Sequence, residues 1–280
     1  MLLSDVCFIA VSYFGSADLS NYMASLHAQT DGRWQLRIVD NSQDDAEFSK
    51  LKSIAGKDRR VEVWKTESNL GYFGAAEWAR ARLDTNSYSW IAVTNTDVVL
   101  DSPDFLASLA SFTQNRVGVV APAIYGSSSR SALNPYMHAR PTLRKSQLRQ
   151  LMLNNVAFAQ ATVVLSHFKR RGAKGRSVPE AETDIYAAHG CFMLFGVAFF
   201  EAGGTFIHDS FLFGEEITIA EFSRHHNLRT VFVPNLTVKH TEHASTGILR
   251  SRLVLKSQVL AARNVTRLIA KGDTGSSTSQ

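Results

Sequence analysis

A short polar triplet, Asn95-Thr96-Asp97, interrupts an otherwise apolar stretch of the sequence. The run Trp90–Val93 before it has the composition of a buried strand, and apolar character resumes at Val98. A strand that ends in an amide and a carboxylate delivers oxygen ligands to the carboxyl edge of a sheet, where open α/β sheets bind their ligands. The alternative is that Asn95 and Asp97 only form a turn, because both residue types favour turns.

Polar residues follow other expected strands in the same way. Asp40 comes directly after Leu36–Val39 and can accept hydrogen bonds from a base or a ribose. Asn69 and Gly71 precede an expected helix, whose free backbone N–H groups and dipole favour a phosphate. A glycine there also lets the backbone approach a ligand closely. Ordinary loop chemistry is the alternative for each position, but their common placement at one sheet edge favours a ligand site.

The second half of the chain carries a different set of candidates. Glu215 and Glu216 open a helix that we expect to run to about His226, and a helix dipole stabilises two carboxylate anions at that end. A plain capping arrangement is the alternative. His240 ends the last expected strand, and a lone histidine is most often a surface or core residue with no part in chemistry.

The elements that must position these residues follow an α/β pattern. Strands expected at Val6–Tyr13, Leu36–Val39, Val61–Trp64 and Trp90–Val93 alternate with helices, which predicts parallel strands joined by right-handed crossovers. We therefore expect a Rossmann-like, mostly parallel central sheet flanked by helices, with a nucleotide-binding half over 1–122. Neither G-x-G-x-x-G nor G-x-x-x-x-G-K-[ST] occurs, which disfavours a dinucleotide site and excludes a P-loop.

Composition places the chain among soluble globular proteins. Its 280 residues, 45% of them hydrophobic, suffice for one large α/β domain. Cys7 and Cys191 lie inside apolar runs and are expected to be buried thiols, which suits a reducing cytosol. The N-terminus lacks a signal-peptide pattern, and the ten-residue apolar run Cys191–Phe200 is too short to span a bilayer. We expect a cytoplasmic protein.

The net charge of +5 is unevenly distributed. Ten Lys or Arg residues and no acid lie between Arg130 and Arg176, and six more follow between Ser245 and Lys271. Such segments suit phosphate groups, nucleic acid or an anionic membrane, or are simply solvated. The aromatic interleaving of a nucleic-acid module is missing, so we expect no nucleic-acid partner. The helix expected at Ile248–Ala270 either rests on anionic lipid at the inner face of the cell membrane or packs on the main domain, which we favour.

Six motifs occur in an order that is informative as a set. They are V-D-N-S at 39–42, S-N-L-G-Y-F-G-A-A at 68–76, N-T-D-V at 95–98, H-G-C-F-M-L-F at 189–195, F-L-F-G-E-E at 211–216 and V-P-N-L-T-V-K-H at 233–240. Over roughly residues 5–245 the chain resembles the family 2 glycosyltransferases with the GT-A fold, especially the bacterial rhamnosyl- and galactofuranosyltransferase-like branch. Arg263-Asn264 is similar to a pair in that branch's C-terminal helix.

The resemblance implies a role for each motif. It implies a single displacement with inversion, in which Glu216, or its neighbour Glu215, takes the proton of the acceptor hydroxyl. It implies Mg²⁺ or Mn²⁺ held by Asp97 and completed by His240. The residues that it places along the nucleotide sugar are Ser12, Asp40, Asn69, Gly71, Asn95, Thr96 and Asp97.

The same resemblance implies an activity and a division of the chain. The donor would be a UDP- or dTDP-sugar and the acceptor a glycan or lipid-linked glycan, in cell-surface polysaccharide synthesis. We expect a catalytic domain over 1–245, with a variable basic insertion at 123–185 and an acceptor half at 186–245. A basic helix at 246–271 and a disordered tail at 272–280 would follow.

The motifs also depart from the family pattern. Asn95 leaves one carboxylate in the metal triplet, Glu216 replaces the usual Asp, and Thr218 stands where a second Asp is frequent. The alternatives are therefore a catalytically degenerate nucleotide- or glycan-binding protein, or a sugar-phosphate nucleotidyltransferase. The latter class would carry a Gly-rich basic loop after the first strand, which Ser12–Ala17 lacks.

Overall fold

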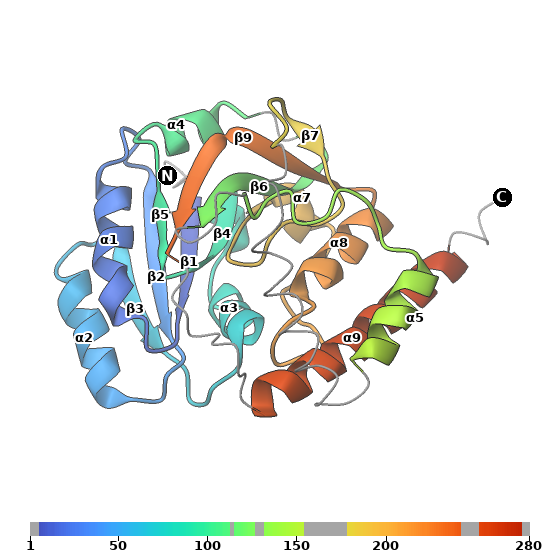
Figure 1. The fold of residues 1–280 in the computed structure, drawn as a ribbon. Coiled ribbons are helices and arrows are strands. Elements are labelled where there is room, and N and C mark those ends of the chain that lie inside the picture. Colours follow the sequence, from blue (N-terminus) through green and yellow to red (C-terminus); the bar gives the residue numbers. More distant parts are fainter. Residues whose placement is uncertain (1–5, 113–114, 127–131, 154–177, 242–251, 276–280) are drawn as a thin grey trace.

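A computed structural model describes residues 6–112, 115–126, 132–153, 178–241 and 252–275, which form one mixed sheet covered by helices on both faces (Figure 1). The strands are β1 (Val6–Ser12), β2 (Trp34–Asp40), β3 (Val61–Lys65), β4 (Trp90–Asn95), β5 (Val98–Leu100), β6 (Val117–Gly126), β7 (Thr183–Asp184), β8 (Phe192–Gly196) and β9 (Arg229–His240). The α-helices are α1 (Ser16–His27), α2 (Asp45–Ala55), α3 (Tyr72–Arg80), α4 (Phe105–Ala110), α5 (Leu143–Met152), α7 (Val197–Glu201), α8 (Glu215–His225) and α9 (Arg252–Gly275).

The strand order is β3-β2-β1-β4-β8-β6-β9-β5, with β7 paired to β9. The first four strands along this path are parallel, as the alternating strands and helices predict. The second half adds antiparallel pairs to the expected parallel ones, so the sheet is mixed: β8 runs antiparallel to both β4 and β6, and β5 runs antiparallel to β9. These strands are not joined by the short strand–helix units that enforce parallel pairing in the first half.

Alternation along the strands produces two apolar layers, one on each side of the sheet. In β1, Phe8 and Ala10 belong to the layer under α1, α2 and α4, whereas Cys7 and Ile9 belong to the layer under α3, α7 and α8. All seven residues of β1 are buried, which explains why the strand reads as a continuous apolar run. Cys7 and Cys191 are both free, buried thiols, as expected.

The strand that carries His240 is longer than expected. The sequence pattern predicts two strands, at 229–233 and 236–240, separated by Pro234-Asn235. The structure has a single strand, β9, whose pairing with β6 shifts register so that Val233 and then Thr237 oppose consecutive β6 residues. The extra residues form a bulge, which accommodates Pro234 without ending the strand.

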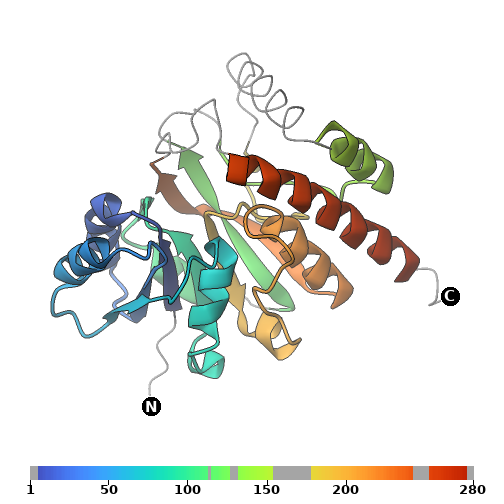
Figure 2. The same cartoon turned by 90° about the horizontal axis from the view of Figure 1, so that it is seen from below.

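The C-terminal helix packs on the protein. Its residues Leu255, Ala261, Ala262 and Ile269 are buried, and α9 lies against α5 and α8 (Figures 1 and 2). This is the packed arrangement that we favoured for the segment 248–270. The helix continues to Gly275, so the first residues of the expected tail at 272–280 belong to it. Much of the expected insertion at 123–185, including 154–177, lies outside the described residues.

Candidate active site

The strand register gathers the predicted nucleotide-site residues at one edge of the sheet. Ser12, the last residue of β1, lies opposite Asp40, the last residue of β2. On the other side of β1, Val11 lies opposite Asn95, the last residue of β4. The carboxyl ends of three neighbouring parallel strands therefore present a hydroxyl, a carboxylate and an amide in a row.

One carboxylate oxygen of Asp40 has no hydrogen-bond partner among the described residues. Its carboxylate is fully buried, and Oδ1 accepts hydrogen bonds from the Ser42 backbone N–H (2.9 Å) and hydroxyl (2.5 Å). The second oxygen, Oδ2, is buried without a hydrogen-bond partner in the part of the chain that the structure describes. Because a buried unpaired acceptor costs free energy, such an atom at a sheet edge indicates a ligand that supplies the missing donor.

Two of the predicted residues, Ser12 and Thr96, also have structural contacts. A side chain at Gly15 would meet both the Thr96 Oγ1 (2.3 Å) and the Ser12 Oγ (3.2 Å), so these two buried hydroxyls pack against the loop after β1. The Ser12 Oγ also accepts a hydrogen bond from the Gly15 N–H at 3.3 Å. Contact of Ser12 and Thr96 with the donor stays a prediction.

Asn41 organises the edge, although the sequence analysis assigned it no role. Its amide Nδ2 donates to the Asn69 Oδ1 (3.0 Å) and to the Gly71 carbonyl (3.1 Å). Its Oδ1 accepts from the Leu70 N–H (2.9 Å) and the Thr66 hydroxyl (3.1 Å). All of the hydrogen-bonding capacity of the Asn41 side chain thus fixes the 66–71 loop to the end of β2. Its position inside the V-D-N-S motif is the sequence feature from which this role could have been inferred.

Gly71 is required by the fold at the start of α3. Its φ of 73° and ψ of −177° lie in a region that residues with a side chain avoid, and an added Cβ would lie 2.1 Å from the Phe211 carbonyl oxygen. We expect Gly71→Ala to lower the free energy of unfolding by on the order of 3 kcal/mol, measured by urea denaturation.

Gly203→Ala is the matched control. Gly203 also has a positive φ, 85°, but apart from Gly203 and its two chain neighbours no atom of the described residues lies within 4 Å of the point that an added Cβ would occupy. Only the backbone strain of about 1–2 kcal/mol therefore applies there. Equal destabilisation by the two substitutions would contradict a close approach between Gly71 and the loop at Phe211.

Strand pairing brings His240 to the acidic residue of the polar triplet. Val98 lies opposite His240 in the β5–β9 pair, and this places the His240 Nε2 at 3.1 Å from the Asp97 Oδ1. The Asn95 amide nitrogen lies 3.5 Å from the same imidazole nitrogen. The Asp97 and His240 side chains are 19% and 12% exposed, so the pair is sheltered yet accessible.

The donor set at this position fits a divalent cation only in part. A carboxylate oxygen and an imidazole nitrogen are both ligands for Mn²⁺ or Mg²⁺, with the carboxylate the harder of the two. Within the described ranges no group of three or more His, Cys, Asp or Glu side chains could hold a metal ion. Asp97 and His240 could therefore supply two ligands, and a diphosphate would have to supply others.

The turn before β8 connects this edge to the carboxylate pair. The Asn95 N–H donates to the Cys191 carbonyl (3.0 Å), and the Tyr72 hydroxyl donates to the Gly190 carbonyl (3.0 Å). A side chain at Gly190 would meet the Glu216 Oε1 at 3.2 Å and the Glu215 Oε1 at 3.4 Å. Both carboxylates thus lie over Gly190. The next residue, Cys191, carries the carbonyl that holds the end of β4.

The two carboxyl groups differ in their electrostatic surroundings. Burial, together with repulsion from Glu216, raises the pKa of Glu215 to about 8. Burial also raises the pKa of Glu216, but hydrogen bonds from its own and the Gly190 backbone N–H groups and the Arg149 charge oppose the shift. Near neutral pH the protein therefore holds Glu215 protonated, and Glu216 is the better placed of the two to be ionised.

His208 faces the same pair and was not expected from the sequence. Its Nε2 lies 4.0 Å from the Glu215 Oε2, and neither buried atom has a hydrogen-bond partner among the described residues. Burial lowers the pKa of His208, so the imidazole is neutral and adds no charge beside Glu215. A single histidine in a loop carries no sequence signal that distinguishes it from the other eight.

The loop that ends at Glu215 has an unusual backbone and a firm support. Phe213 and Gly214 both have positive φ, 68° and 93°, immediately before α8 begins. Strain of this kind persists where surrounding contacts impose it. The contacts come from α9: the Asn264 Nδ2 donates to the Asp209 carbonyl (2.9 Å), and Arg267 pairs with the Asp209 carboxylate (2.8 Å).

Two exposed aromatic residues also follow β1. Tyr13 and Phe14 are 60% and 54% exposed, and their rings meet edge to face with centroids 5.0 Å apart. Phe14 has a φ of 55°, which a bulky residue rarely adopts. Exposed aromatic rings that directly follow Ser12, the residue opposite Asp40, are suited to stack on a planar base. In the sequence, Tyr13 ends the expected strand and Phe14 follows it, and this position at the strand end was the missed signal.

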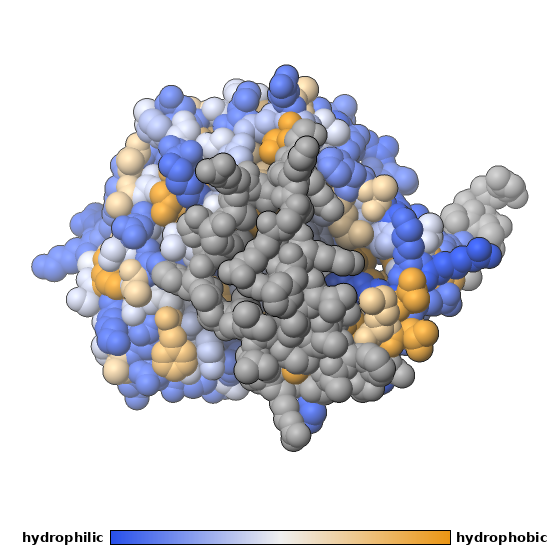
Figure 3. All heavy atoms as spheres, in the orientation of Figure 1, coloured by the Kyte–Doolittle hydropathy of each residue, from blue (hydrophilic) through white to orange (hydrophobic). Residues whose placement is uncertain are grey.

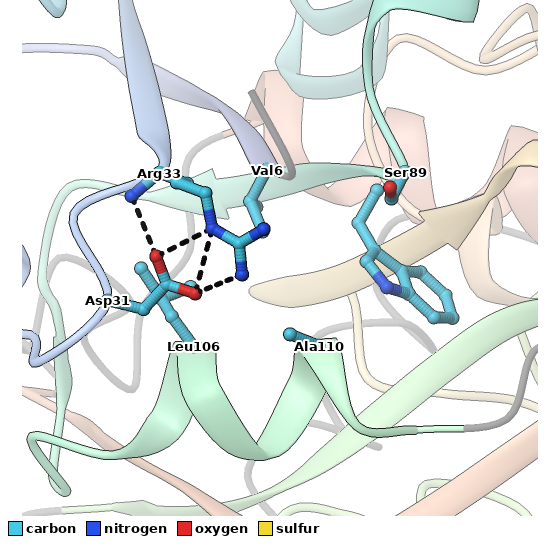
Figure 4. Close-up of a pocket in the computed structure, with 7 residues that line it drawn as sticks. Val6, Asp31, Arg33, Ser89, Leu106 and Ala110 are labelled. Carbon is cyan, nitrogen blue, oxygen red and sulfur yellow. Dashed lines mark hydrogen bonds and ion pairs between the residues drawn. The ribbon is translucent and has the colours of Figure 1, made fainter. Parts of the chain in front are cut away.

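A small polar pocket lies elsewhere, at the amino ends of the strands (Figure 4). Val6 and Trp90, which begin β1 and β4, line it together with an Asp31–Arg33 ion pair of 2.7 Å. Neither the sheet-edge residues nor the carboxylate pair border this pocket. Of the helices in the described part of the chain, none is long and apolar enough to cross a bilayer.

A sheet of this order with polar strand ends and a facing carboxylate pair is the arrangement of the GT-A fold, a fold of glycosyltransferases. Residues 7–170 match the family model described as Glycosyl transferase family 2, so the chain belongs to that family. No curated protein matches the sequence.

Solved structures support the fold at low sequence identity. GalNAc-T7 with UDP, GalNAc and Mn²⁺ superposes with a TM-score of 0.62 at 14% identity, covering 85% of this chain and 44% of that one. TarS from S. aureus gives 0.55 at 11% identity, over 97% of this chain and 72% of that one. The mannosyltransferase PcManGT from Pyrobaculum calidifontis, in complex with GDP-Man and Mn²⁺, gives 0.53 at 12% identity, over 98% and 75%. The chain thus spans less than half of the length of GalNAc-T7.

Proposed function

We propose that this protein is an inverting, metal-dependent glycosyltransferase that moves a sugar from a nucleoside-diphosphate donor to a glycan or lipid-linked glycan acceptor. The observation that carries the proposal is that Asp40 and the Asp97–His240 pair lie at the carboxyl edge of the sheet, while the Glu215–Glu216 pair lies over Gly190, next to the Cys191 carbonyl that holds the end of β4. Each group suits one part of such a reaction. The GT-A relatives crystallised with UDP, UDP-GlcNAc or GDP-Man support a nucleotide-sugar donor.

The donor would lie along the carboxyl edge of the sheet. The unpaired Asp40 Oδ2 would accept a hydrogen bond from the base or ribose, and Tyr13 would stack on the base. Gly71 and the α3 N-terminus would lie along the nucleotide, positioned by Asn41 and Asn69. The donor nucleotide is UDP or dTDP in this proposal, as the resemblance to the rhamnosyl- and galactofuranosyltransferase-like branch implies.

The diphosphate would lie between Asp97 and His240 on one side and the Gly71 loop on the other. Mg²⁺ or Mn²⁺ held by Asp97 and His240 would act as a Lewis acid toward the diphosphate charge that develops as the sugar leaves. The protein's own part is to hold Asp97 and His240 together through the β5–β9 pairing. The Asn95 amide adds no second carboxylate, so the bound diphosphate must contribute ligands.

Glu216 is the base in this proposal. Its carboxylate takes the proton of the acceptor hydroxyl, and the acceptor oxygen forms a bond to the anomeric carbon. The bond from that carbon to the diphosphate oxygen breaks, and its electron pair leaves on the nucleoside diphosphate. Because the acceptor attacks the donor directly, one displacement inverts the anomeric centre. Each carboxyl group receives a hydrogen bond from its own backbone N–H, and we infer Glu216 over Glu215 because the Gly190 N–H and the Arg149 charge also favour the ionised form of Glu216.

A nucleotide-release assay tests the proposal. The full chain would be incubated with UDP-, dTDP- and GDP-sugars, Mn²⁺ and a bacterial lipid extract, and nucleoside diphosphate would be measured. Release from one nucleotide class, increased by the extract, supports the transferase and names the donor. If none of the donors is turned over although a nucleoside diphosphate binds, the protein is a binding protein of the same fold. This second outcome would overturn the proposal.

A further inference from the structure

The helix α5 departs from the pattern of an ordinary surface helix, because its one buried residue is polar and most of its apolar residues are exposed. Its inward side carries the buried Ser146, whose backbone carbonyl accepts a hydrogen bond from the Thr266 hydroxyl of α9 at 3.1 Å. A helix on the surface of a globular protein normally turns its apolar side chains inward. In α5 the buried residue that contacts α9 is small and polar, and the only apolar residue of the helix that is partly buried is Leu143.

The outward side of α5 carries the apolar residues. Leu148, Leu151 and Met152 are 58%, 67% and 49% exposed. Their spacing of three and four residues places them on one face of the helix. Single exposed leucines are common on protein surfaces, but three adjacent apolar side chains on one short helix form a patch that indicates a partner.

Cations flank this apolar patch. Arg144, Lys145 and Arg149 are all exposed, and α5 contains no acidic residue. Figure 3 shows hydrophobic and strongly hydrophilic surface side by side over α5, on the right of the molecule. Apolar side chains bordered by Lys and Arg are typical of helices that lie in the headgroup region of anionic membranes. If a second copy of the chain bound this face through its own α5, the three cations of each copy would face one another and repel, so an anionic lipid surface is the better match.

The position of α5 relates the patch to the candidate active site. α5 packs on α9, which packs on α8 and holds the loop before Glu215 through Asn264 and Arg267. The Arg149 charge acts on Glu216 at the start of α8. A surface that contacts α5 therefore lies on the same side of the molecule as the carboxylate pair.

We propose that the outward face of α5, formed by Arg144, Lys145, Leu148, Arg149, Leu151 and Met152, docks the protein onto an anionic lipid surface. Docking by this face delivers a lipid-linked acceptor to the side of the molecule where Glu216 lies. The delivery rests on the proposed function, whereas the docking does not.

Vesicle co-sedimentation tests the docking without any nucleotide sugar. The full chain should sediment with phosphatidylglycerol vesicles and remain in solution with phosphatidylcholine vesicles. Leu148→Asn/Leu151→Asn should weaken binding at least tenfold, because the apolar side chains that enter the headgroup region are lost. Arg144→Gln/Lys145→Gln/Arg149→Gln should weaken it at least tenfold at low salt, and wild-type binding should fall as salt rises.

Matched controls test whether binding depends on this face of α5 or on exposed charge and apolar surface in general. Lys52→Gln/Lys57→Gln/Arg59→Gln removes three exposed cations from α2 and the turn after it, at the opposite end of the molecule (Figure 1), and should bind like wild type. Ile207→Asn removes an apolar side chain that is 68% exposed in another loop and should also bind like wild type. Melting curves of all variants would confirm that they are folded.

Three outcomes would overturn the proposal. They are no sedimentation with anionic vesicles, equal losses in the α5 and α2 charge variants, and a wild-type dimer in sedimentation velocity that Leu148→Asn/Leu151→Asn dissociates. The last result would assign the face to a second copy of the chain. Nucleotide release is assayed separately from vesicle binding. Failure of the docking therefore leaves the transferase proposal standing, and failure of the transferase proposal leaves the docking standing.

Discussion

Asp97→Ala is expected to abolish sugar transfer and to remove the effect of Mn²⁺ on nucleotide binding. Asp97 is the one carboxylate of the polar triplet, and the His240 Nε2 at 3.1 Å is its neighbour. Its loss would leave a single imidazole to hold the cation. Charge stabilisation by a cation is worth several kcal/mol in such reactions, so transfer should fall on the order of a thousandfold. The measurement is nucleotide release in the presence of acceptor.

Asp101→Ala is the matched control for this substitution. Asp101 directly follows β5, is 34% exposed and pairs with Lys239, the residue before His240. Its carboxylate has no role in the proposed reaction. It should retain transfer within a few-fold of wild type. Equal losses in the two variants, or full transfer by Asp97→Ala, would contradict a metal role for Asp97.

The second large effect is expected at Glu216. Replacing the carboxylate by an isosteric amide removes the base, and Glu216→Gln should lose about 10²–10⁴-fold in transfer while it binds the nucleotide as well as wild type does. Glu215→Gln is the matched control, because it lies at the adjacent position over Gly190 and should lose less than tenfold. A larger loss in Glu215→Gln than in Glu216→Gln would assign the base to Glu215.

The carboxylate pair also predicts a pH dependence of stability. Burial and the neighbouring Glu216 raise the pKa of Glu215 to about 8, against 4.5 for an unperturbed glutamate. The folded state therefore binds more protons than the unfolded state between these values, and stability falls as pH rises through this window. Glu215→Gln should be more stable than wild type at pH 7, on the order of 3 kcal/mol, with little difference near pH 4.

Urea denaturation of the two proteins at pH 4.5 and pH 7.5 measures this difference. Asp209→Asn serves as a control, because Asp209 is exposed and its side chain pairs with Arg267. Its stability relative to wild type should not improve with rising pH. A Glu215→Gln variant that follows the wild-type pH profile would show that the folded protein does not hold a protonated Glu215.

The sequence predicts the first half of the fold and most of the sheet edge because local pattern decides them. Buried parallel strands such as β1 are continuous apolar runs, and each is followed by the polar residue that ends it. In this way Asp40, Asn95 and Asp97 could be assigned to one edge from the chain alone, and the register of β1, β2 and β4 aligns the strand ends as expected.

The remaining parts depend on contacts that are distant in the sequence. The antiparallel placement of β8 between β4 and β6 and the bulge in β9 at Pro234 follow from sheet pairing, which periodicity does not encode. His208 lies near Glu215 across a loop that α9 contacts through Asn264, an arrangement that local sequence does not encode. The outward apolar face of α5 could not be predicted either, because the spacing of apolar residues alone does not show whether they face the protein or the solvent.

The most direct test of the nucleotide site is the melting temperature of wild type and Asp97→Ala with UDP, dTDP or GDP, each with and without Mn²⁺. A ligand that binds only the folded state stabilises it by mass action, by about 2.7 kcal/mol at a hundredfold excess over Kd. We predict that UDP or dTDP stabilises wild type far more with Mn²⁺ than without it, and that Asp97→Ala loses this difference. Stabilisation by no nucleotide, or equal shifts in both proteins with and without Mn²⁺, would contradict the site.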